Sequence, residues 1–338
     1  MNSSLLSFLC VSYNHEKFIE NCMKSIWNND YKNIEVIVLD DGSKDNSVKI
    51  LNKLKEQSPF SMKIIAQENT GNIGANFNKL ISEASGEFLS FISCDDMVIE
   101  NTIFQKIQEL VNNKNLAYIC HSKIIGVDNN GERINTVPPL TLDIIKNPTV
   151  EDILNLDYKE IGSYYIQGAI YRKAIIDNSG GFDDDMICDD IIFRTKLSRY
   201  MLKHPELELK VLKTPAIYYR RHENNISSNA LRQVKGVMQY YRRYWNDKEL
   251  PEMFYKWLYN LDRTDLLELI IADEYKIKIF NNLDNHYIKS ALFPLEYPYK
   301  IIGIPYIFAI YSFKISRKKI KHIKLFNIKI FEYTKEIK

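Results

Sequence analysis

The sequence lacks the features that mark several large classes of protein. Its five cysteines are scattered without C-x-x-C spacing, which argues against a zinc knuckle and against a disulfide framework. We therefore expect free thiols in a reducing cytoplasm. No signal peptide is expected, because no long apolar run follows a basic N-terminal segment. The apolar stretch at residues 301–313 is far shorter than the roughly 20 residues that span a bilayer.

Neither sign of charge dominates the chain as a whole, since its formal net charge is +2. The distribution is uneven: nine Lys/Arg and two Glu lie between Lys314 and the end, which leaves 36 basic and 41 acidic residues elsewhere. A mildly acidic body argues against nucleic-acid binding. Residues 318–326 alternate basic and apolar side chains, so we expect this tail to contact an anionic membrane surface. A solvated terminal strand or helix is the alternative.

What the sequence does contain is an alternation of strand and helix patterns. Its 338 residues allow one large domain or a domain with an appendage. Strands are predicted at 5–12, 34–39, 62–66, 87–92, 116–125, 164–171 and 209–219. Helices are predicted at 18–27, 48–54, 73–84, 101–111 and 191–202, and again after about residue 225, whereas 126–160 is predicted as a loop. Repeated β-α-β units predict a Rossmann-like α/β fold, with a mainly parallel central sheet and helices on both faces.

Pairs of acidic residues follow three of these segments. Asp40-Asp41 and Asp95-Asp96 end apolar strand patterns, and Asp189-Asp190 follows the turn at residues 180–183. Open α/β sheets place their ligand sites at strand ends. Carboxylate oxygens suit Mg²⁺ or Mn²⁺, and a remaining carboxylate can accept a proton. These pairs indicate a cation, a polyanionic substrate and a base.

With Val11-Ser12-Tyr13-Asn14 upstream, this ordered set resembles the family 2 glycosyltransferases, the large inverting group with the GT-A fold, over about residues 5–228. The resemblance implies a GT-A domain at 1–228 and a helical C-terminal region at 229–338, carrying the membrane-contacting tail. It implies transfer of one hexosyl or N-acetylhexosaminyl group from a nucleotide-sugar donor, expected to be UDP-linked, with inversion. The expected acceptor is a saccharide, lipid-linked, in bacterial O-antigen or capsule synthesis at the inner face of the cell membrane.

The resemblance assigns the donor contacts to three segments near strand ends. They supply Val11, Tyr13, Asn14, Asp40, Asp41, Asn69, Gly71 and Asn78. In the family, the first segment wraps the base and the residue equivalent to Asp41 reads the uracil ring. The family more often has Ala-Arg-Asn near Asn78. An Asx turn and helix capping would explain the same residues without a ligand.

The resemblance also implies that the site holds a divalent cation, Mn²⁺ or Mg²⁺. Asp95 and Asp96 stand where the family has Asp-x-Asp, although Ser93 replaces the usual first Asp. Either could ligate the metal, and Asp95 could also contact the donor. In the Tyr-Arg-x-His segment, His222 would reach the metal or the diphosphate, and Arg220 or Arg221 the phosphates. No other histidine is assigned a role.

The Gly-Gly-Phe-Asp turn followed by Asp189-Asp190 is the strongest match. The family has Glu-Asp at this point, so Asp189 replaces a Glu; Asp189 is expected to contact substrate and Asp190 to be the catalytic base. Capping of a helix by carboxylates would explain both residues without catalysis.

Two rivals remain beside this interpretation. A non-catalytic, degenerate transferase could bind a nucleotide or glycan as a scaffold. The departures from the family motifs at Ser93 and Asp189 would support this alternative. A sugar nucleotidyltransferase would need a Gly-rich basic loop after the first strand, and residues 12–15 do not form one. The sugar, the acceptor and the oligomeric state are left open.

Overall fold

The protein is described here from a computed structural model. It describes residues 4–135, 140–223, 225–259, 261 and 265, and the backbone of 323–325 and 328–331. The chain divides into two compact units, Met1–Phe254 and Tyr255–Lys338. The first unit is therefore longer than the expected 1–228. The reason is helix α8 (Ala230–Tyr244), which buries Val237 and Tyr240 and joins the Tyr240 hydroxyl to that of Thr195 at 2.8 Å.

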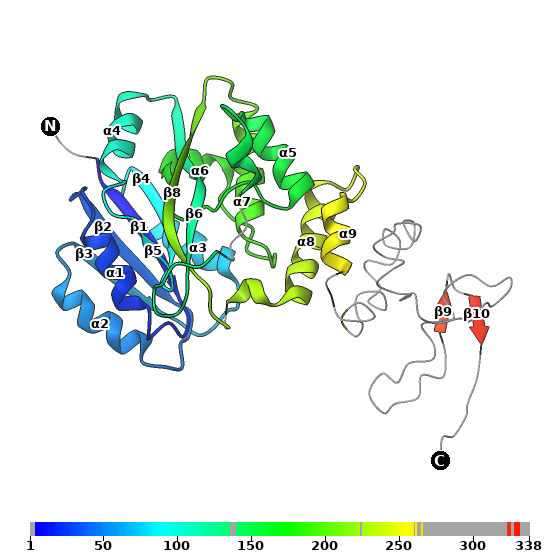
Figure 1. Cartoon of the computed structure of the whole chain (residues 1–338), viewed down its shortest axis with the longest axis horizontal. Helices are drawn as coiled ribbons and strands as arrows, with labels where there is room; N and C mark the ends of the chain where they lie inside the picture. The colour runs from blue at the N-terminus through cyan, green and yellow to red at the C-terminus, as the bar shows by residue number, and fades with distance from the viewer. Residues whose placement is uncertain are drawn as a thin grey trace, which may run out of the picture. The chain divides into compact units, whose positions relative to one another are not determined.

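The first unit is built on an 8-stranded sheet with the order β3-β2-β1-β4-β7-β6-β8-β5 (Figure 1). The strands are β1 (Leu6–Ser12), β2 (Ile34–Asp40), β3 (Ser61–Ala66), β4 (Phe88–Ser93), β5 (Met97–Val98), β6 (Leu116–Val127), β7 (Ile170–Arg172) and β8 (Glu208–Arg220). The pairs among β1 to β4 and the pair β6–β8 are parallel. Only β7 and β5 pair antiparallel with their neighbours. The predicted α/β class with a mainly parallel sheet is confirmed.

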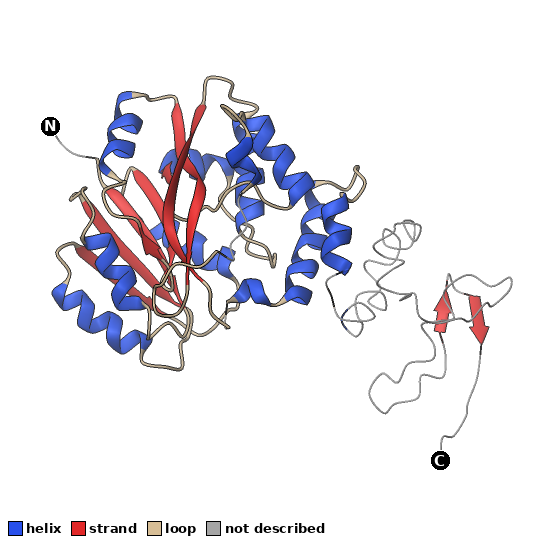
Figure 2. Cartoon of the chain, viewed as in Figure 1, coloured by secondary structure: helices blue, strands red, loops and turns tan. Residues whose placement is uncertain are grey.

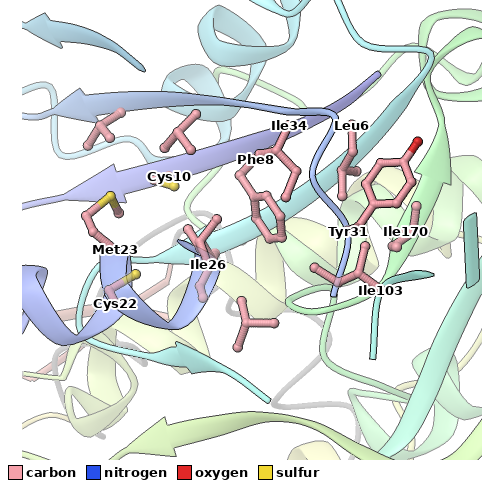
Figure 3. Close-up of a cluster of buried hydrophobic side chains, with 14 of the residues drawn as sticks. Leu6, Phe8, Cys10, Cys22, Met23, Ile26, Tyr31, Ile34, Ile103 and Ile170 are labelled. Carbon is pink, nitrogen blue, oxygen red and sulfur yellow. The ribbon is translucent and has the colours of Figure 1, made fainter. Parts of the chain in front are cut away.

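Helices pack on both faces of this sheet (Figure 2). They are α1 (Ile19–Trp27), α2 (Ser47–Gln57), α3 (Ile73–Glu83), α4 (Phe104–Asn112), α5 (Val150–Glu160), α6 (Lys173–Ser179) and α7 (Asp190–Met201). Later in the chain come α8 and α9 (Glu252–Tyr259), which contribute none of their described residues to the two apolar clusters of the sheet. Alternate residues of β1 divide between two apolar clusters, as the pleat of a strand requires. Leu6, Phe8 and Cys10 face α1, α2 and α4 (Figure 3), whereas Leu9 faces the side covered by α3, α5, α6 and α7.

The segment 126–160 departs from prediction, because it contains a short 3₁₀ helix (Thr141–Ile144) and α5. Helix α5 begins with a capping box, in which Thr149 and Asp152 each bond the other's backbone N–H. The strand expected at 164–171 is replaced by the shorter β7, which begins at Ile170. Helix α6 and strand β5 were not predicted.

The C-terminal expectations are met in part. Helices α8 and α9 fit the predicted helical start, with a 3₁₀ turn (Ile226–Ser228) before α8. In the basic tail, however, β9 (Ile323–Leu325) lies within the alternating segment and forms an antiparallel pair with β10 (Ile328–Phe331), which follows it. The rest of the predicted basic tail lies outside the described residues. Among the described residues, the search for a helix long and apolar enough to cross a membrane finds none.

Candidate active site

The carboxyl ends of β1, β2 and β4 lie side by side, because these strands pair in parallel and in register. Ser12 stands opposite Asp40, and Val11 opposite Ser93. The backbone pairing continues past the strand ends, where Asp41 N donates to Ser12 O at 2.9 Å. The loops that begin with Tyr13, Asp41 and Cys94 therefore leave one edge of the sheet, where open α/β folds bind their ligands.

Asp41 organises the loop that follows β3. Its carboxylate accepts hydrogen bonds from Gln67 Nε2 at 2.9 Å, Thr70 N at 2.9 Å and Gly71 N at 3.2 Å. Burial raises the pKa of Asp41, but the bonds from Gln67, Thr70 and Asn76 outweigh burial and lower it. Asp41 is thus an ionised acceptor that holds the loop carrying Gly71.

Asn69 lies against Gly42, the residue that follows Asp41. A β-carbon on Gly42 would lie 2.6 Å from Asn69 N, and Gly42 has φ +78°. Glycine is therefore required after Asp41, since both the contact and the left-handed backbone exclude larger residues. The predicted residues Asp41, Asn69 and Gly71 are brought together.

Asp40 does not face the site, in contrast to its predicted contact with substrate. Its side chain is buried and accepts from Ser12 Oγ at 3.0 Å, Ser43 N at 2.9 Å and Ser43 Oγ at 2.6 Å. Because both carboxylate oxygens are engaged, Asp40 ties the end of β1 to the turn after β2.

Asn14 and Tyr13 shape the loop after β1. Asn14 has φ +55°, its N–H donates to Ser43 Oγ at 2.8 Å, and its Oδ1 accepts from Lys44 N at 2.7 Å. Tyr13 is 43% exposed at the tip, and Val11 is half-buried within β1. An exposed ring on a loop fixed by Asn14 suits stacking on a base.

Asn78 holds the turn before α7, and its contact with substrate stays a prediction. Its Oδ1 accepts from Phe182 N at 3.0 Å and its Nδ2 donates to Phe182 O at 3.0 Å. A β-carbon on Gly181 would lie 2.8 Å from Asn78 Oδ1, which explains the second glycine of the turn. Asn72, the N-cap of α3, also donates to the Asp184 carbonyl.

Asp95 lies at the centre of a compact cluster with two histidines. Its Oδ2 is 3.0 Å from His222 Nε2 and 3.8 Å from His15 Nε2. Among the described residues, these three form the group whose ligand atoms all lie within 4.8 Å of one another. Asp95 Oδ1 and His15 Nδ1 are buried without a hydrogen-bond partner. Two imidazoles and a carboxylate with an unpaired oxygen fit a divalent cation.

The charges of this cluster suit metal binding. Burial raises the pKa of Asp95, but the hydrogen bond with His222 and the neighbouring His15 lower it to about 2. Burial lowers the pKa of His15, and Asp95 opposes this only in part. A carboxylate beside a neutral imidazole is the protonation state that ligates metals. Sequence reasoning missed His15, although it directly follows the Val-Ser-Tyr-Asn segment.

Asp96 is not part of this cluster. Its Oδ1 accepts from Arg220 N at 2.7 Å, and burial together with the adjacent Asp95 raises its pKa well above the ordinary value. Of the two carboxylates left open by the sequence, Asp95 is therefore the one placed to ligate a metal, and Asp96 joins the site to β8.

Arg220 is buried and cannot reach a phosphate, contrary to prediction. Its guanidinium donates to the carbonyls of Asp95 at 2.9 Å, Asp128 at 2.6 Å and Asn129 at 3.0 Å. It also lies 4.8 Å above the Phe18 ring. Arg220 instead fixes the backbone behind the cation cluster.

Arg221 has the accessible position. With Asn129, His222, Glu223 and Ser228 it lines an open cleft of about 610 Å³. A guanidinium in such a cleft can bind phosphate oxygens, as predicted for one of the two arginines.

Asp189 and Asp190 begin helix α7. Asp189 Oδ1 accepts from Asp190 N at 2.8 Å and so caps the helix, which is the structural alternative to substrate contact. Asp190 keeps 33% of its side chain exposed, and its Oδ2 lies 3.8 Å from Arg194 Nη1. Burial and the charge of Asp189 raise the pKa of Asp190 to about 7, against the opposing charge of Arg194. A carboxyl that titrates near neutrality is suited to general base catalysis.

Tyr165 is a further aromatic residue near these groups, and it was not predicted. Burial raises its pKa, and the charges of Arg221, Asp190 and Asp96 all act on it. Its ring centroid lies 5.3 Å from that of Tyr219.

Comparison with known proteins agrees with this geometry. Residues 7–180, more than half of the chain, match the sequence model of Glycosyl transferase family 2. The chain belongs to this family.

Curated relatives within the family match only in part. Glycosyltransferase GlyG of Streptococcus pneumoniae is 37% identical over 110 residues, 32% of this chain and 36% of the relative. The putative glycosyltransferase EpsH of Bacillus subtilis is 40% identical over 98 residues, 29% and 28% of the two chains. Poly-beta-1,6-N-acetyl-D-glucosamine synthase of Staphylococcus aureus is 25% identical over 217 residues, 60% of this chain and 48% of the relative. The matches thus span less than half the length of these relatives.

Solved structures share the fold. S. aureus TarS in complex with UDP-GlcNAc has a TM-score of 0.54 and 22% identity, covering 79% of this chain and 67% of that one. The mannosyltransferase PcManGT of Pyrobaculum calidifontis, in complex with GDP-Man and Mn²⁺, has a TM-score of 0.51 and 14% identity, covering 74% and 66%. The predicted GT-A-like fold is confirmed.

Proposed function

We propose that the protein transfers one hexosyl or N-acetylhexosaminyl group from a UDP-sugar to a saccharide hydroxyl, with inversion. The observation that carries the proposal is Asp190, a partly exposed carboxylate with a pKa of about 7, at the first residue of α7. The UDP preference is supported by the TarS complexes with UDP and UDP-GlcNAc, which share the fold.

A single displacement accounts for inversion. The Asp190 carboxylate accepts the proton of the acceptor hydroxyl, and the acceptor oxygen attacks the anomeric carbon from the opposite side to the diphosphate. The bond from that carbon to the diphosphate oxygen breaks with its electron pair, which leaves UDP. Asp95 and His222 would hold a divalent cation, Mn²⁺ or Mg²⁺, which when bound neutralises the leaving diphosphate. Arg221 is placed to add a further positive charge.

Calorimetric titration of the protein with UDP tests this assignment, with GDP and CMP as matched controls and with and without Mn²⁺. Binding of UDP alone among the three is the expected result. A preference for GDP or CMP would overturn the proposed donor, and absence of all nucleotide binding would overturn the transferase assignment. UDP binding without turnover of any UDP-sugar would favour a non-catalytic scaffold.

We also propose that the acceptor is lipid-linked, in bacterial surface-polysaccharide synthesis, and that the protein works at the cytoplasmic face of the membrane. The excess of nine Lys/Arg over two Glu from Lys314 to the end supports this, since each basic residue near an anionic surface adds about 1 kcal/mol. Removing residues 314–338 should move the protein from membrane to soluble fractions, and unchanged partitioning would refute the anchor.

A further inference from the structure

His15 stands beside the two predicted members of the cation cluster, although the three residues come from distant parts of the chain. His15 follows β1, Asp95 follows β4 and His222 follows β8. Two atoms bound about 2.1 Å from one ion lie up to about 4.2 Å apart. The 3.0 Å and 3.8 Å separations from Asp95 Oδ2 fall inside this limit. The 4.8 Å bound on the whole set exceeds it by an amount that side-chain rotation can close.

One oxygen of this cluster is open to a bound ion. Asp95 Oδ1 is buried and has no hydrogen-bond partner among the described residues. Buried polar atoms are normally paired, and an ionised oxygen left unpaired in the interior is costly. The Asp95 side chain is 11% exposed and that of His222 is 7% exposed, so water reaches them poorly. An ion held against Asp95 would satisfy its free oxygen.

We propose that His15, Asp95 and His222 bind a transition-metal ion in the free protein, before any nucleotide arrives. Three protein ligands can retain an ion without help from a donor diphosphate, and leave open positions on it for phosphate oxygens. Two imidazole nitrogens favour Mn²⁺, Co²⁺ or Zn²⁺ over Mg²⁺, which prefers an oxygen shell. The inference rests on the proposed function only in that the same ion later faces the donor.

The full-length protein without nucleotide is titrated with MnCl₂ and followed by calorimetry and by the loss of the free Mn²⁺ paramagnetic resonance signal. Wild type is expected to bind Mn²⁺, and His15→Ala and His222→Ala to bind it more than about tenfold more weakly. His204→Ala is the matched control, because His204 is exposed and pairs with Glu206 outside the cluster. Excess MgCl₂ is expected not to displace Mn²⁺ from wild type.

His15→Asp keeps the test informative if His15→Ala loses its fold. This variant restores a donor but changes nitrogen to oxygen, so Mn²⁺ binding should return and the preference over Mg²⁺ should narrow. Equal Mn²⁺ binding by wild type and His15→Ala would remove His15 from the site. Binding that appears only after UDP is added would overturn nucleotide-independent loading, yet leave the transferase assignment intact. UDP titration without metal reports on the donor site separately, so failure of the two proposals can be distinguished.

Discussion

Asp190→Asn is the substitution that most directly tests the chemistry of the site. It retains the size of the side chain and removes its ability to accept a proton. General base catalysis contributes about 10² to 10⁴ in rate, so sugar transfer should fall by that factor while UDP binding changes little. Transfer is measured as UDP release from the UDP-sugar in the presence of acceptor, and UDP binding by calorimetry.

The raised pKa of Asp190 gives the same test a pH dependence. Its value of about 7 means that about one carboxylate in ten is ionised at pH 6, so kcat/KM for wild type should fall about tenfold per pH unit below 7. The rate rises with pH because only the ionised form accepts a proton. Asp189→Asn is the matched control: it can still cap α7 and removes the charge that helps to raise the Asp190 pKa, so the acidic limb should move to lower pH.

Two results would refute this reasoning. Transfer by Asp190→Asn at the wild-type rate would remove Asp190 as the base. An acidic limb that stays in place in Asp189→Asn would show that the limb belongs to another group.

Three further substitutions test structural roles. Two are at residues that the sequence predicted to contact substrate, and the third is at a glycine. Arg220→Ala leaves buried carbonyls without their charged donor and should lower the free energy of unfolding by about 3–5 kcal/mol in urea titrations; a loss below 1 kcal/mol would contradict its burial. Asn78→Ala removes two hydrogen bonds to the Gly-Gly-Phe-Asp turn and should cost about 1–3 kcal/mol, seen as a lower Tm. Gly168→Ala would place a β-carbon 2.7 Å from that of Ala216 at a residue with φ +73°, and it should lower the free energy of unfolding by about 2–4 kcal/mol. Gly131→Ala is the control, because Gly131 has φ +88° but open space around it, and it should lower the free energy of unfolding by only about 1 kcal/mol. Equal losses of stability in the two variants would argue against the contact with Ala216.

The first half of the fold was predictable because its strands are buried on both faces. Five of the seven residues of β2 (Ile34–Asp40) are apolar, and such continuous runs between amphipathic helices indicate parallel β-α-β units. Helix α5 (Val150–Glu160) was missed because prolines nearby suggested a loop, and its capping box ends in Asp instead of Glu or Gln. The strand expected at 164–171 is interrupted by Gly168, whose positive φ ends regular pairing.

The site was predictable in its residue types but not in the partners of each side chain. Asp41 and Asp95 were proposed as site residues because acidic groups after strands are typical of α/β ligand sites. Asp190 and His222 were proposed from the resemblance of the segments around them to the family motifs. The role of Asp96 depends on a bond to the Arg220 backbone, 124 positions away, which no local pattern encodes. For the same reason, the sequence alone could not show that Arg220 is buried and Arg221 is not. Nor could it show that His15 lies beside Asp95.

Helix α3 links two parts of the candidate active site. It begins directly after the loop that Asp41 holds, and Asn72 and Asn78 both bond the turn that leads to α7. The loop and the turn are therefore held by the same helix. A shift of α3 would move the Asp41 loop and the turn before Asp190 together, so the position of this one helix couples the two parts of the site.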